Sequence, residues 1–249
     1  MTRAFWLAAI TLWERELIRF WRQKSRVLGF VGMPLLFWLF IGSGFGDLAF
    51  FFPGALTMTV MFSAIFSMMS LIEDRREGFL LSVLVSPAPR AAIATGKILG
   101  AATLAWLQGV IFLLFLPLTT LRPSPLALAQ LVAVLYVIAF TFTALGFVFA
   151  WQMDSTQGFH AVMNLVLFPL WMVSGALFTV NSAHGWMQWL MKVNPLTYAL
   201  AALRRLLEPA PPAGTPEFLF SLVLTALSGV LLWIASAVAA GRRPARSFS

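Results

Sequence analysis

The stretch EDRREGFLLSVLVSPAPRAAIATGK, residues 73–97, is a long polar interruption between two strongly apolar blocks. The blocks on either side, residues 53–72 and 99–121, are each apolar enough to cross a bilayer, which takes about 20 residues of helix for a core of about 30 Å. A charged connection of this length is too elaborate to be a simple turn. We expect it to contact something on one side of the membrane, and that contact to decide the function.

The composition is that of an integral membrane protein. Of the 249 residues, 60% are apolar and 10% are charged, whereas soluble domains carry about 25% charged residues. The mean hydropathy of +0.88 agrees with this class. The chain has no cysteine, which excludes disulfides and cysteine-based metal or redox sites. No cleavable signal peptide is apparent at the N-terminus, because residues 1–26 hold too many charges.

Long apolar runs recur along the whole chain, and they predict an all-α membrane fold in a single domain, residues 1–249. Six runs have spanning length, at residues 27–46, 53–72, 99–121, 126–150, 159–180 and 218–240. The remaining segments are an N-terminal helix at 1–26, the polar loop at 73–98 and a connection at 181–217.

Lysine and arginine predict the orientation. Thirteen of the 17 lie in residues 1–26, in the 73–98 loop or in the C-terminal tail. Six spans place these three segments on one side, and the positive-inside rule makes that side cytoplasmic, with both termini. The net charge of +8 is therefore interpreted as topology and contact with anionic lipid, and no nucleic-acid partner is expected.

Residues 1–26 read as an amphipathic helix lying in the membrane interface. Trp13 belongs to an aromatic stripe at helical spacing, and an arginine stripe that includes Arg15, Arg19 and Arg22 lies on roughly the opposite face. Two roles are open for this helix: a simple anchor whose arginines fix topology, or an interface helix that also contacts a partner.

The 181–217 connection is predicted to hold short external helices seated at the membrane interface. Trp186 and Trp189 suggest one such helix, Asn194-Pro195 ends it, and Leu196–Leu207 forms another. In the preceding span, Pro169 is expected to cause a kink and Gly175 to allow close helix approach.

A few side chains inside the spans are candidates for a substrate pathway. Methionines such as Met61 and Met68 offer an adaptable apolar lining, although core packing is the more common role. Gln108 lies in mid-span and needs amide partners, for which an interhelical hydrogen bond is the main alternative to a substrate contact. Asn164, near the start of the fifth span, is the fourth candidate.

The sequence contains no motif or group of ionisable residues that would supply energy for transport. The acidic residues lie near or outside the span boundaries, and there is neither an HExxH nor a GxxxxGK[ST] pattern. Ion-coupled carriers normally bury ionisable relays in their spans, and two isolated histidines make a metal site improbable. A transporter of this composition would have to take its energy from a partner.

The pattern of residues 73–100 resembles the cytoplasmic loop of ABC type-2 exporter permeases. Within that family, the segment EGFLLSVLVSPAPR is most similar to the drug-resistance and lipo-oligosaccharide branch. NPLTYALAALRRLL at 194–207, after FPLWMVSGALF at 168–178, supports the resemblance, which covers essentially the whole chain. The resemblance implies a coupling helix at 86–95 that receives force from an ATPase. The residues implied in this coupling are Glu73, Asp74, Arg75, Arg76, Glu77, Gly78, Ser86, Pro87, Arg90 and Lys97.

On this resemblance, Arg90 is expected to reach an acidic groove on the ATPase. Residues 73–77 are expected to form salt bridges to the N-terminal helix or to the ATPase, and a lipid-headgroup cluster is the alternative. No cofactor is expected on this chain, because ATP and Mg would bind two ABC ATPase subunits. The other partners implied are a second permease copy, membrane lipid and an amphiphilic substrate.

The function expected is that of a non-enzymatic permease subunit in the bacterial cytoplasmic membrane. Within an ATP-driven exporter it would move amphiphilic drugs, lipids or lipid-linked glycans. Two alternatives stay open: a non-transporting membrane scaffold, and a membrane enzyme that modifies lipid.

Overall fold

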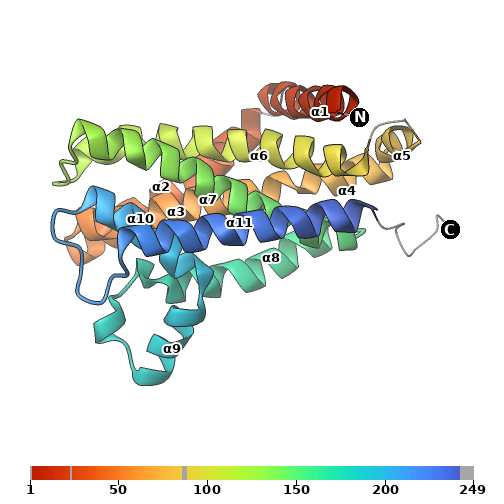
Figure 1. The fold of residues 1–249 in the computed structure, drawn as a ribbon. Coiled ribbons are helices and arrows are strands. Elements are labelled where there is room, and N and C mark those ends of the chain that lie inside the picture. The colour runs from red at the N-terminus through yellow and green to blue at the C-terminus, as the bar shows by residue number, and fades with distance from the viewer. Residues whose placement is uncertain (1, 23, 86–88, 242–249) are drawn as a thin grey trace.

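A computed structural model describes residues 2–22, 24–85 and 89–241, and within them every regular element is a helix (Figure 1). This confirms the all-α fold class. The elements in chain order are α1 (Thr2–Arg22), α2 (Lys24–Phe45), α3 (Leu48–Ser67), α4 (Met69–Arg76), α5 (Phe79–Leu84), α6 (Arg90–Phe112), η1 (Leu113–Leu118), α7 (Pro125–Gln152), α8 (Thr156–Trp171), η2 (Met172–Ala176), η3 (Val180–Ser182), α9 (Gly185–Val193), α10 (Pro195–Leu207) and α11 (Phe218–Gly241).

Among the described residues, five helical stretches are long and apolar enough to cross a membrane. They are Leu48–Arg76, Arg90–Leu118, Pro125–Gln152, Thr156–Ala176 and Phe218–Gly241. The first of the six predicted spans, 27–46, falls in α2, whose described apolar part is the shorter Gly32–Phe45.

The bundle is built around α3 and its continuation α4. Of the 18 most apolar consecutive residues in Leu48–Arg76, 89% are buried, whereas in Phe218–Gly241 only 17% are buried. Helices α3 and α4 are therefore central, and α11 is peripheral. Small residues let neighbouring helices approach α3 closely. A Cβ at Gly146 of α7 would lie 3.0 Å from the Cα of Ile65, and one at Gly109 of α6 would lie 2.6 Å from a methyl group of Val60.

Local signals explain several helix ends. Ser124 caps α7 by accepting a hydrogen bond from the Ala127 amide, with Pro125 at the first helical position. Asn194 caps α10 in the same way, followed by Pro195. The α9–α10 boundary therefore lies where the Asn-Pro pair predicted it.

The fifth span breaks near its end, but for a different reason from the one expected. Pro169 lies within α8, which gives way to the π-helical η2, where Val173 and Gly175 leave helical geometry. Gly175 has φ of +96°, a conformation that favours glycine. The predicted close approach at Gly175 is wrong, since a Cβ there would meet no atom nearer than 3.5 Å. The close contact lies instead between Gly54 and Ala176.

The connection at 73–98 is shorter than predicted, because helices extend into it from both sides. The span before it continues to Arg76, and α6 begins at Arg90. Gly78, with φ of +77°, starts the short helix α5 at Phe79–Leu84. A helix confined to 86–95 is therefore wrong: residues 90–95 are the first turns of α6, with Pro89 at its N-cap, and residues 86–88 lie outside the described residues.

Candidate functional site: a buried ion-pair network

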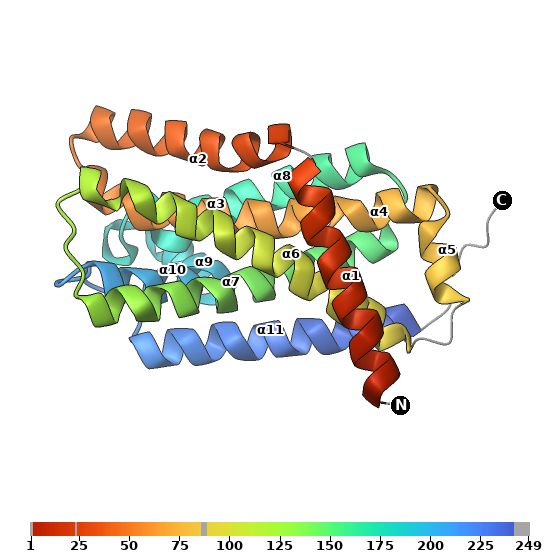
Figure 2. The same ribbon diagram turned by 90° about the horizontal axis from the view of Figure 1, so that it is seen from above.

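Helix α1 lies across α6 near the end of the bundle that also holds α5 and the end of α11 (Figure 2). Two glycines of α6 set the distance between the helices. A Cβ at Gly96 would lie 2.6 Å from the carbonyl oxygen of Ala9, and one at Gly100 would lie 2.8 Å from Cβ of Glu16. The inner face of α1, formed by Ala9, Leu12 and Glu16, is consequently buried.

Charged side chains from three helices meet beneath α1. Glu16 of α1 is 4% exposed, Asp74 of α4 is 0% exposed and Lys97 of α6 is 1% exposed. The Nζ of Lys97 donates to Oε1 of Glu16 at 2.6 Å and also to the carboxylate of Asp74. The Oγ of Ser70 donates to the second oxygen of Glu16 at 3.0 Å. Burying charges is costly unless they are paired and hydrogen-bonded, and here both conditions hold.

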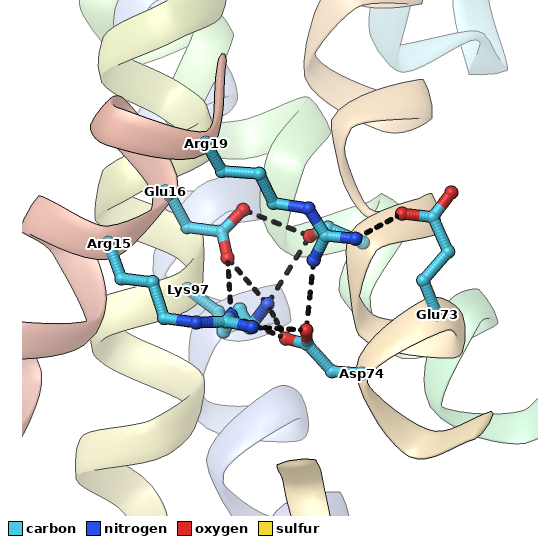
Figure 3. Close-up of polar contacts among 7 residues, drawn as sticks. Arg15, Glu16, Arg19, Glu73, Asp74 and Lys97 are labelled. Atoms are coloured by element: carbon cyan, nitrogen blue, oxygen red, sulfur yellow. Dashed lines mark hydrogen bonds and ion pairs between the residues drawn. The ribbon is translucent and has the colours of Figure 1, made fainter. Parts of the chain in front are cut away.

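Two arginines of α1 complete the cluster (Figure 3). Arg15 binds both oxygens of Asp74, at 2.8 and 3.0 Å. Arg19 bridges Asp74 at 2.9 Å and Glu73 at 2.6 Å. Burial acts to lower the pKa of Arg15, but hydrogen bonding and attraction to Asp74 outweigh it, so the pKa lies above its usual range. We refer to these six side chains as the ion-pair network: Arg15, Glu16, Arg19, Glu73, Asp74 and Lys97.

Helix α5 is attached directly to this network. The guanidinium carbon of Arg15 lies 3.7 Å from the centroid of the Phe79 ring, within the range of a cation–π contact. Leu80 is 4% exposed and belongs to the hydrophobic core. The first turn of α5 is therefore held against both α1 and the bundle.

The expected salt bridges between residues 73–77 and the N-terminal helix are confirmed for Glu73 and Asp74. Lys97 was expected in the loop, but it lies inside α6 and forms the centre of the network. Trp13 was expected in the lipid boundary, whereas its indole nitrogen donates to Oγ1 of Thr103 at 3.1 Å.

The arginine stripe of α1 points into the bundle. The side chains of Arg15 and Arg19 turn inward to the carboxylates, while the apolar side chains of Trp6 and Ile10 are exposed. The structure does not describe the side chain of Arg22, although this residue ends α1.

Other predicted coupling residues lie apart from the network. Arg75 turns toward the end of α7, where it donates to the carbonyls of Trp151 and Met153 and pairs with Asp154. Arg76 and Glu77 are exposed.

Arg90, expected to reach an acidic groove on a partner, donates to the carbonyl of Gly241 at 3.1 Å and thereby contacts the end of α11. Ser86 and Pro87 lie outside the described residues.

The four candidate pathway residues differ in their surroundings. Met61 and Met68 are fully buried in the core. Gln108 is also buried, but neither amide atom has a hydrogen-bond partner among the described residues, so the expected interhelical bond is not formed there. Asn164 is half-buried on α8, and its amide nitrogen is 2.9 Å from Nδ1 of His160.

Glu16 is the functional residue that the sequence did not single out. It alternates with arginines in the run Glu14–Arg19, a pattern typical of a solvated helix face. A signal was nevertheless present: Glu16 falls on the same helical face as Ala9 and Leu12, at spacings of three and four residues. An acid on that apolar face requires a buried cation, which Lys97 supplies.

The network is suited to joining helices. Its charges are balanced, three cations against three carboxylates, and they connect α1, α4 and α6 while contacting α5. The bidentate Arg15–Asp74 pair and the buried pairs of Lys97 fix the positions of these helices relative to one another.

Comparison with known proteins identifies the family. The chain is 28% identical to the inner membrane transport permease YadH of Escherichia coli, over 82% of this chain and 84% of that protein. It is 28% identical to the daunorubicin resistance ABC transporter permease protein DrrB1 of Streptomyces coeruleorubidus, with coverage of 81% and 75%. It is 26% identical to the probable doxorubicin resistance ABC transporter permease protein DrrC of Mycobacterium tuberculosis, with coverage of 89% and 80%.

The family model described as ABC-2 type transporter matches residues 8–207, a range that contains the whole ion-pair network, α5 and α10. The expected family resemblance is thus confirmed, and multi-pass membrane insertion follows from it and from the apolar helices. The chain belongs to the ABC-2 type transporter family as a membrane permease.

Proposed function

We propose that this chain is the permease subunit of an ATP-driven exporter that moves amphiphilic molecules across the bacterial cytoplasmic membrane. Support comes from the family, and from relatives named for daunorubicin and doxorubicin resistance. The energy would come from ATP and Mg bound to a separate ABC ATPase, since the sequence has no GxxxxGK[ST] pattern of its own.

The observation that carries the proposal is the ion-pair network beside α5. A force applied to α5 would pass through Phe79 to Arg15, and from Arg15 through Asp74 to α4 and α6. An ATPase that docks on α5 would thereby move two spans together. In this account α5, together with the residues up to Arg90, serves as the coupling element.

The same end of the bundle would be cytoplasmic. The start of α1 and the end of α11 both lie toward it (Figure 1), and the lysine and arginine bias of the sequence favours the cytoplasm for it. In this orientation α2 would supply a sixth span, while α9 and α10 would lie at the outer surface.

The working complex would contain two ATPase subunits and a second copy of the permease, with a central pathway between the copies. An amphiphilic cargo suits a pathway among apolar, aromatic-rich spans. The relatives' names favour a drug, and the resemblance also admits a lipid or a lipid-linked glycan.

Co-reconstitution with an ABC ATPase from the same genome tests this function. The permease in proteoliposomes should not hydrolyse ATP, the complex should, and ATP should drive daunorubicin or a labelled phospholipid across the bilayer in one direction. The control is the complex with a Walker-lysine variant of the ATPase. Hydrolysis that is indifferent to the permease, with no ATP-dependent movement of either probe, would reject the proposal.

A further inference from the structure

A second buried charge lies at the opposite end of the bundle from the network. Arg204 of α10 is only 4% exposed, yet it lies outside the candidate membrane spans. Its guanidinium donates to Oε1 of Glu208 at 2.8 Å, within its own helix end. Burial lowers the pKa of Arg204 and raises that of Glu208, so desolvation opposes both charges. Such a pair persists only if other contacts hold it in place.

Arg204 also joins three segments that are distant in sequence. It donates to the carbonyl of Gly175 in η2 at 3.1 Å and to the carbonyl of Phe50 in α3 at 3.2 Å. Its guanidinium lies 4.4 Å from the centroid of the Phe50 ring. The carbonyl of Gly175 sits at the break of the fifth span, where regular helical hydrogen bonding ends. One side chain therefore fastens α10 to that break and to the start of α3.

The surfaces that Arg204 holds together are incompletely packed. A cavity of about 20 Å³ lies between α10 and η2, lined by Arg204, by hydroxyl residues that include Ser174 and Thr197, and by apolar residues such as Leu200. The Oγ1 of Thr197 is buried without a hydrogen-bond partner among the described residues. Separating these surfaces would hydrate the buried hydroxyl of Thr197, which offsets part of the cost of exposing the apolar side chains beside it.

We propose that Arg204 is a positioning residue that holds a seam between α10 and η2 closed, and that its release opens this seam to the outer solution. The outward placement of the seam rests on the orientation under the proposed function. The seam itself rests only on the contacts of Arg204 and on the cavity. The open seam would let water reach the outer end of the bundle, together with the polar part of an amphiphile.

The absence of cysteine from the chain gives a clean test. Thr197→Cys places a nearly isosteric thiol in the cavity lining. In purified protein, its reaction with a water-soluble maleimide should be slow. Adding Arg204→Met should accelerate it by about tenfold or more, because hydrogen bonds to a charged group contribute enough to shift an opening equilibrium that far. Arg204→Lys keeps the positive charge but loses the planar set of guanidinium donors, and its maleimide reaction rate should be intermediate.

Two controls separate a local opening from loss of structure. Arg122→Met removes an arginine of the connection between η1 and α7, which donates to the carbonyls of Thr119 and Leu121 away from the cavity lining, and it should leave the thiol at position 197 protected. Ala139→Cys, in the core of α7 at 0% exposure, should stay unreactive beside Arg204→Met. Equal protection of position 197 with and without Arg204 would overturn the seam, as would equal labelling at 139 and 197.

The side of the seam is tested separately from ATP-driven transport. Trp189→Cys on the exposed face of α9 should react with an impermeant maleimide added to intact cells. Protection there would overturn the outward placement. Neither labelling experiment uses an ATPase, so a failure of the proposed transport function would appear in different measurements.

Discussion

At the scale of single residues, Lys97 decides whether the end of the bundle is stable. It is the cation between two buried carboxylates, Glu16 and Asp74, that come from different helices. The sequence placed Asp74 and Lys97 in one polar segment and predicted pairing between that segment and α1. It did not identify Glu16, because an acid flanked by arginines looks solvated until the partner helix that covers it is known.

Replacing Lys97 by methionine should therefore destabilise the protein strongly. The change leaves Glu16 and Asp74 facing each other with less compensation, and breaking a buried pair from one side costs about 3–5 kcal/mol. The measurement is the free energy of unfolding in detergent, from denaturant titration. Arg76→Gln, on an exposed residue of the same polar segment, is the matched control and should change stability by less than about 0.5 kcal/mol. Equal free energies of unfolding for the two variants would show that the charge of Lys97 does not stabilise the protein.

At the scale of elements, the contact between α1 and α6 depends on two glycines. The sequence indicated an amphipathic α1, but periodicity does not tell whether its apolar face meets lipid or another helix. Gly96 and Gly100 hold that information, since only a residue without Cβ accommodates the backbone of Ala9 and the side chain of Glu16 at these distances. The predicted coupling helix at 86–95 was wrong for a similar reason, since local signals do not show how far a helix continues once it packs against others. Pro89 lies at the N-cap of α6, but the helix that begins there does not end at residue 95, because the small residues that follow it pack as one continuous helix.

Gly96→Ala should loosen α1 from the bundle. The new methyl group would meet the carbonyl oxygen of Ala9 at 2.6 Å, and because that atom is backbone the helices must separate. Overpacking of this kind costs about 1–3 kcal/mol. Hydrogen exchange of the α1 amides should rise in this variant. Gly32→Ala in α2 is the control, since nothing lies within 4 Å of its Cβ position, and there alanine should be neutral or stabilising. If both variants exchange alike, α1 is not held by this contact.

At the scale of the whole molecule, charge is concentrated at the two ends of an apolar bundle. The ion-pair network lies at one end, and Arg204 lies at the other, where α3, η2 and α10 converge. Five of the six predicted spans and the α9–α10 boundary could be read from hydropathy and the Asn-Pro signal. The long-range contacts of the ion-pair network and of Arg204 could not be read from the sequence, because they depend on which helix faces meet. The central claim is that the network transmits force from α5 to the spans.

The most direct test of that claim is the amount of daunorubicin transported per ATP hydrolysed by the reconstituted complex, in a double-mutant cycle on Arg19 and Glu73. This pair joins α1 to α4 at 2.6 Å near the surface of the network. Each single change to glutamine should lower transport per ATP by about tenfold, an energy of about 1.4 kcal/mol, while stimulated hydrolysis persists. The double variant should be no worse than the poorer single variant, because the two residues act as one unit. Unchanged transport per ATP in both single variants, or fully additive losses in the double variant, would contradict the account.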